Sequence, residues 1–173
     1  MHISHKHILC SIALFMVATI SCNAIADQIL INTKTPFAEH AQVREKVKKE
    51  CQLDTKLPVF IKQFADSDDI QVALQTEPFD MNKGKVLMLE ITNVVAQGGG
   101  AWSGAKSMSI AGKLYDSGNM IGDFKAMRYS GGGAFGGFKG TCSIVGRCSK
   151  ALGKDVANWL RNPTKDAHLG DDS

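Results

Sequence analysis

Cysteine and histidine are the side chains of this chain best suited to nucleophilic, redox or metal-binding chemistry, and five of each are present. Beyond the first 26 residues, the cysteines and histidines that remain are Cys51, Cys142, Cys148, His40 and His168. The two histidines are well separated, no C-x-x-C occurs, and no paired carboxylates or serine, histidine and aspartate set can be recognised. The sequence therefore predicts no metal site, no cofactor and no enzymatic activity.

The three cysteines predict one disulfide, because two of them should pair in an oxidising compartment. Cys142 and Cys148 are six residues apart in a predicted helix, where their side chains point to different faces and their Cα atoms are too far apart to bridge. We therefore expect Cys51 to pair with Cys142 or Cys148. A thiol-dependent enzyme that uses Cys142 or Cys148 is the alternative hypothesis.

Residues 1–26 have the pattern of a secretory signal peptide, with an apolar run from Ile8 to Ile20 and small residues before a cleavage point near Ala26. The alternative is acylation of Cys22, which would make the protein a lipid-anchored envelope component. No other stretch is long and apolar enough to span a bilayer, so no transmembrane helix is expected in the mature chain. The predicted location is the periplasm or the exterior, with membrane attachment only if Cys22 is lipidated.

Charge and length limit the remaining possibilities. Twenty basic residues oppose 17 acidic ones, a net charge of +3, which argues against nucleic acid as a partner. Residues 27–163 suit a single domain with a core of its own, and residues 164–173 are expected to be a polar flexible tail.

Three strand-like runs between residues 85 and 129 predict an antiparallel meander, with a tight turn at Asp116-Ser-Gly-Asn119. The elements expected around it are strands over 28–32 and 70–74 and helices over 38–51, 56–64 and 141–161. Together these elements predict an α+β fold. In it, a mainly antiparallel sheet has helices, including a C-terminal helix, packed on one face.

Two glycine-rich loops, over 98–105 and 130–140, should lie at the same end of that sheet, because alternate connections of a meander lie at opposite ends. At this end we predict a binding surface for an unknown envelope protein, peptide or glycan. Its residues would be Trp102, Lys106, Arg128, Phe135, Phe138 and Lys139. In the alternative interpretation, the aromatic side chains fold back as a lid over the sheet end.

Several segments resemble an uncharacterised family of secreted Gram-negative envelope proteins, a domain of unknown function. They are Gly98-Gly-Gly-Ala-Trp-Ser-Gly-Ala-Lys-Ser107, Leu114 to Gly118, Gly132-Gly-Ala-Phe-Gly-Gly-Phe-Lys-Gly-Thr-Cys142 and Asp155-Val-Ala-Asn-Trp-Leu160. More distantly, the chain is similar to domains related to the curli-secretion lipoprotein, which belong to envelope assemblies. The resemblance implies an envelope protein and carries no catalytic residue over to this chain. By elimination, we therefore predict a non-catalytic periplasmic or secreted envelope protein that acts as a binding module.

Overall fold

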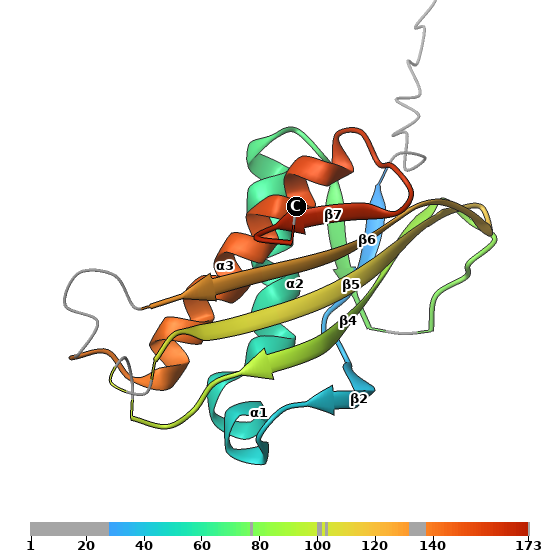
Figure 1. The fold of residues 1–173 in the computed structure, drawn as a ribbon. Helices are drawn as coiled ribbons and strands as arrows, with labels where there is room; N and C mark the ends of the chain where they lie inside the picture. Colours follow the sequence, from blue (N-terminus) through green and yellow to red (C-terminus); the bar gives the residue numbers. More distant parts are fainter. Residues whose placement is uncertain (1–27, 77, 100–101, 103, 132–137, 173) are drawn as a thin grey trace, which may run out of the picture.

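The structure, a computed structural model, describes residues 28–76, 78–99, 102, 104–131 and 138–172. The signal segment predicted over residues 1–26, with Cys22, lies outside these residues. The described chain forms one sheet with three helices (Figure 1). In order, the elements are β1 (Ile29–Asn32), β2 (Phe37–Gln42), α1 (Glu45–Cys51), α2 (Leu53–Ser67), β3 (Val72–Gln75), β4 (Lys85–Val95), β5 (Lys106–Asp116), β6 (Asn119–Ser130), α3 (Thr141–Leu160) and β7 (Ala167–Gly170).

The predicted antiparallel meander is confirmed in β4, β5 and β6, which are 11, 11 and 12 residues long. β4 pairs with β5 from Lys85 opposite Asp116, and β5 pairs with β6 from Asp116 opposite Asn119. The turn between β5 and β6 consists of Ser117 and Gly118, with φ values of 48° and 84°. Positive φ at both central residues is what a two-residue turn needs to match the twist of the strands.

The sheet is mixed, which corrects the expectation of a mainly antiparallel one. Its strand order is β3-β1-β4-β5-β6-β7, and β2 also pairs with β4. The pairs β1 with β3, β1 with β4, β2 with β4, and β6 with β7 are all parallel. The short outer strands β1, β2, β3 and β7 therefore pair in parallel, an arrangement that a short hairpin between neighbouring strands cannot produce.

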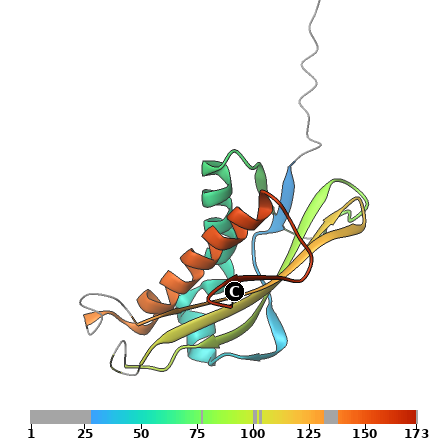
Figure 2. The ribbon, with the colours of Figure 1, turned by 45° about the horizontal axis from the view of Figure 1, so that its top comes forward.

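Helices α2 and α3 cover one face of the sheet and leave the other face without a helix, as predicted (Figure 2). α3 packs against β5 and β6, and α2 packs against α3 and β3. Alternate strand residues such as Leu87, Ile91 and Ile110 are buried in one apolar core with Leu152 and Val156 of α3. The packing of the helices on the sheet holds the ends of β4, β5 and β6 in place, and thereby positions the loops that connect them.

The helix predicted over 38–51 is wrong in its first part, because β2 occupies residues 37–42 and α1 begins only at Glu45. The apolar spacing that predicted a helix holds within α1, where Val47 is buried. β2 instead runs beside β4, and the Ile91 backbone N–H donates to the Pro36 carbonyl at 2.8 Å. A segment with an ambiguous local pattern takes the conformation that its neighbouring strand stabilises.

The segment 164–173, expected to be a flexible tail, contains β7, which pairs with β6. Gly170 has φ of +77°, and a Cβ atom there would lie 2.5 Å from the Met127 carbonyl oxygen. The next residue, Asp171, accepts a hydrogen bond of 2.8 Å from the Arg128 guanidinium. These contacts join residues more than 40 positions apart, so the polar composition of the segment did not reveal them.

The sequence favours Thr141 as the N-cap of the C-terminal helix, but the N-cap is Gly140 and Thr141 is the first residue of α3. The Thr141 hydroxyl instead donates to the Gln97 backbone carbonyl at 3.0 Å. α2 extends beyond the predicted range of 56–64 at both ends, and Pro58 therefore lies inside the helix. In the described part of the chain, no helix combines the length and the apolar character needed to cross a membrane.

Candidate functional site

The described parts of the two glycine-rich loops lie at the same end of the sheet, as the meander predicts (Figure 1). The hydrogen bond from the Thr141 hydroxyl to the Gln97 carbonyl joins the end of the second loop to the start of the first. Gly98 and Gly140, one from each loop, line the same cleft. We call residues 96–99, 102, 104–105, 131 and 138–143 the loop end.

Two aromatic side chains of the loop end are almost fully exposed. Trp102 is 86% exposed and Phe138 is 92% exposed. The Trp102 backbone N–H donates to the Gly99 carbonyl at 3.2 Å, which helps to fix the first loop. Such exposed fractions do not fit the interpretation that these two side chains fold back as a lid over the sheet. The third predicted aromatic residue, Phe135, lies outside the described residues.

The predicted basic residue Lys106 is buried, with an exposed fraction of 0%. It is the first residue of β5, and its ammonium group donates to the Gly104 carbonyl at 2.8 Å. A buried charge is stable only when such partners replace water. Lys106 therefore stabilises the base of the first loop from inside, and its charge does not face solvent.

Arg128 holds two carboxylates. Its guanidinium makes two hydrogen bonds of 2.8 Å to Asp155 of α3 and a third of 2.8 Å to Asp171. The hydrogen bond to Asp155, followed by the charges of both carboxylates, raises the pKa of Arg128 above its already high ordinary value. Lys139 directly follows the exposed aromatic residue Phe138, and its side chain is half-buried.

A cleft of about 430 Å³ at the loop end is lined by residues of α1 and of the first turn of α3. Arg44, Lys46 and Glu50 line its α1 side, and Thr141 and Ser143 line the opposite side. Lys46 and Glu50 form an ion pair of 3.9 Å, whereas the Arg44 guanidinium has no ion-pair partner among the described residues. The rim of the cleft is therefore basic. No local pattern in the sequence indicates this cleft, because α1 and α3 are far apart in the chain.

The disulfide joins Cys51 of α1 to Cys142 of α3, with Cα atoms 4.9 Å apart, and confirms one of the two expected pairings. The free thiol, Cys148, is buried beneath the sheet, and its Sγ donates to the Lys106 carbonyl at 3.5 Å. Burial raises the pKa of Cys148 to about 11. Neither Cys142 nor Cys148 therefore supplies an accessible thiolate near neutral pH, which argues against the thiol-enzyme hypothesis.

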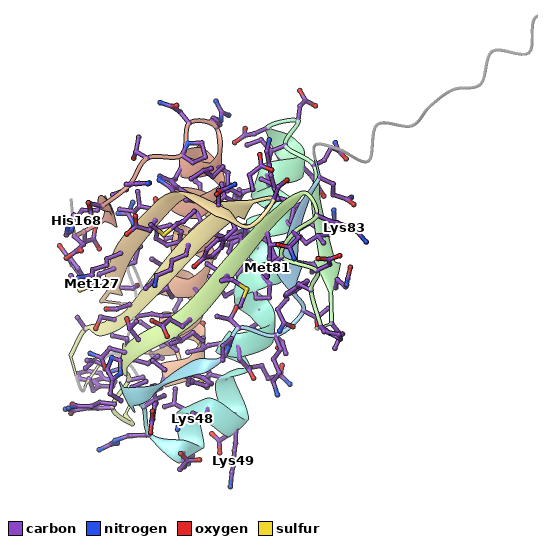
Figure 3. All side chains as sticks on the ribbon, turned by 90° about the vertical axis from the view of Figure 1, so that its right-hand side faces the viewer. Lys48, Lys49, Met81, Lys83, Met127 and His168 are labelled. Carbon is purple, nitrogen blue, oxygen red and sulfur yellow. A yellow bond between two sulfur atoms is a disulfide. The ribbon has the colours of Figure 1, made fainter. Side chains whose placement is uncertain are left out.

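The structure also contains a groove of about 420 Å³ on the face of the sheet that carries no helix. Figure 3 shows this face, with Met127 of β6 at its edge and Lys48 and Lys49 of α1 below it. Glu90 and Lys113 line the groove with Met88 and Pro36. Met88 and Glu90 alternate along β4 with the buried residues Leu87, Leu89 and Ile91, so their side chains lie on the face opposite the core. Within the described residues, no group of three histidine, cysteine or acidic side chains can hold a metal ion.

No protein-family model matches this chain, and no curated protein matches it. Among solved structures, a PelC dodecamer from Paraburkholderia phytofirmans is similar with 10% identity and a TM-score of 0.47, over 75% of this chain and 87% of that chain. A variant of the PelC dodecamer from the same organism matches with 12% identity and a TM-score of 0.46 over the same shares. A minor lipoprotein from Acinetobacter baumannii matches with 10% identity and a TM-score of 0.43, over 83% of this chain and 98% of that chain.

Proposed function

We propose that this chain is a non-catalytic envelope protein that binds a partner through its loop end. The observation that carries the proposal is the exposure of Trp102 and Phe138, at 86% and 92%, on two loops at one end of the sheet. Single exposed apolar residues are common on proteins, but large aromatic side chains gathered at one end mark interaction surfaces. Burying each of them in an interface would contribute about 1.5–3 kcal/mol.

The six predicted site residues divide into two roles in this proposal. Trp102 and Phe138, together with Phe135, supply apolar contact, and Lys139 supplies a positive charge next to it. Lys106 and Arg128 act from below, because their hydrogen bonds to Gly104 and to Asp155 hold the strand ends from which the loops start. The partner is an envelope protein, a peptide or a glycan.

The periplasm or the exterior of the cell is the compartment that fits this proposal. The Cys51–Cys142 disulfide is of a kind that persists in oxidising compartments and is rare in the cytosol. The signal segment over residues 1–26 would deliver the chain there. A lipid-anchored component, acylated at Cys22, is the alternative, and the mass of the processed N-terminus distinguishes the two.

Photo-crosslinking in living cells tests the proposal. A benzoylphenylalanine replaces Trp102 or Phe138, and the control replaces Val59, which is 52% exposed on α2. We expect covalent adducts of a defined envelope component from positions 102 and 138 and none from position 59. Equal labelling at all three positions, or no adduct at 102 and 138, would contradict a binding role for the loop end.

A further inference from the structure

We infer that the loop end docks on the surface of an anionic lipid bilayer, with Trp102 and Phe138 entering the interface between headgroups and acyl chains. This inference rests on the proposed binding role of the loop end, and it assigns to that site a lipid surface in place of the envelope protein, peptide or glycan named above. Tryptophan and phenylalanine on an exposed, basic surface are the side chains that proteins place at membrane interfaces. Trp102 and Phe138 are more exposed than any other large hydrophobic residue in the described chain, where the next is Tyr129 at 64%.

The charge of the loop end favours an anionic surface. Neither residues 96–107 nor residues 130–147 contain an acidic residue, whereas they carry Lys139 and Arg147 in addition to the buried Lys106. The neighbouring helix α1 and its N-cap add four basic residues, Arg44, Lys46, Lys48 and Lys49, against two acidic ones, Glu45 and Glu50. Exposed lysine and arginine side chains near a bilayer are attracted by anionic headgroups.

The polar side chains of the loops favour lipid over a glycan. Carboxylate and amide side chains are well suited to hydrogen-bond the hydroxyl groups of a sugar. In residues 96–105 and 130–140, Gln97 is the one side chain of that kind. Because the described parts of both loops lie at one end of the sheet, Trp102 and Phe138 can enter a single flat surface together.

Intrinsic fluorescence gives a direct test, because the chain has two tryptophans in opposite environments. Trp102 is exposed, whereas Trp159 is 6% exposed and packs edge-to-face on Phe124 with ring centroids 4.9 Å apart. Insertion into lipid would therefore change the emission of Trp102 and leave that of Trp159 unchanged. A Trp102→Phe variant removes the reporter and keeps an aromatic side chain.

The experiment uses the processed form of the Cys22→Ser chain, which cannot be acylated, with its N-terminus verified by mass. Vesicles contain equal amounts of phosphatidylcholine and phosphatidylglycerol, or phosphatidylcholine alone. We expect a blue shift on the anionic vesicles, quenching by lipids brominated in the acyl chain, and weaker binding to phosphatidylcholine. The variants Trp102→Ala and Phe138→Ala should each lower the partition coefficient about tenfold. Binding of Trp102→Ala, which lacks the fluorescent reporter, is measured by co-sedimentation with the vesicles.

Val59→Ala is the matched control, because it also shortens an exposed apolar side chain but lies on α2, and its partition coefficient should be unchanged. Absence of a blue shift, or equal binding by Phe138→Ala and the unchanged chain, would overturn the inference. Protein or glycan adducts at positions 102 and 138, without vesicle binding, would leave the proposed function standing and exclude the lipid partner. If no adduct forms at positions 102 and 138 and the chain does not bind vesicles, both the proposed function and the lipid inference are wrong.

Discussion

Cys51 at the end of α1 and Cys142 in the first turn of α3 are 91 residues apart in the chain and covalently joined in the structure. Both residues line the cleft at the loop end. The disulfide therefore fixes the distance between the two walls of this cleft. It also closes a loop that includes α2 and the strands β3 to β6.

Removal of this disulfide should destabilise the domain. A cross-link that closes a loop of this length restricts the unfolded chain, and loss of a native disulfide costs about 2–5 kcal/mol. We expect the double variant Cys51→Ala, Cys142→Ala to lose that much free energy of unfolding in urea titrations. A reducing agent should have the same effect on the unchanged chain and none on the double variant. Equal midpoints with and without reductant would contradict the expectation.

The Cys148 thiol should be unreactive in the folded protein. It is 1% exposed, and burial raises its pKa to about 11, so both access and thiolate formation are suppressed. An aromatic disulfide reagent at neutral pH should label it slowly in the native state and rapidly in denaturant. The Cys148→Ala variant shows which part of the signal belongs to this residue. Rapid native labelling would restore the thiol-enzyme hypothesis.

The same pKa shift predicts a loss of stability at high pH. The thiol pKa is raised in the folded state, so the stability that the group contributes is complete below pH 9.0 and is lost as the pH rises towards about 11. The difference in unfolding free energy between the unchanged chain and Cys148→Ala should therefore shift against the unchanged chain across this range. A pH-independent difference would contradict the assignment.

Two glycines of α3 form a matched pair for testing the packing of α2 on α3. A Cβ atom on Gly153 would lie 2.6 Å from the Phe60 Cβ, whereas one on Gly146 would meet nothing within 4 Å. Gly153→Ala should cost about 1–3 kcal/mol because the helices must separate. Gly146→Ala should be neutral or stabilise the protein by up to about 1 kcal/mol, because alanine is the better helix former. Thermal unfolding of both variants measures the contrast, and equal effects would contradict it.

Arg128 should hold β7 in place. Arg128→Lys keeps the charge but cannot reproduce the paired hydrogen bonds to Asp155 together with the bond to Asp171. We expect a loss of about 1–3 kcal/mol and faster amide hydrogen exchange in Ala167–Gly170. Arg161→Ala removes a more exposed ion pair with Asp68 and should leave exchange in β7 unchanged. Unaltered protection of β7 in Arg128→Lys would exclude the proposed role.

The sequence alone predicted the elements whose structure depends on residues close to one another in the chain. The meander over 85–129, the turn at Asp116 and the C-terminal helix arise from local hydrophobic periodicity and turn chemistry, and the structure confirms them. The connectivity of the meander also predicted that both glycine-rich loops lie at the same end of the sheet. The helical spacing of Cys142 and Cys148 limited the disulfide to two possible pairings of Cys51. The packing of α1 on α3 decided that the partner is Cys142.

Only the tertiary structure decided the elements whose partners are distant in sequence. Residues 37–42 form the strand β2 because they pair with the backbone of β4. Residues 167–170 form β7 because they pair with β6, and the adjacent Asp171 accepts a hydrogen bond from Arg128. Likewise, the burial of Lys106 depends on what α3 and the first loop place around it, which its position at a strand start does not reveal. Periodicity records which face of an element is buried. It does not record which distant segment covers that face.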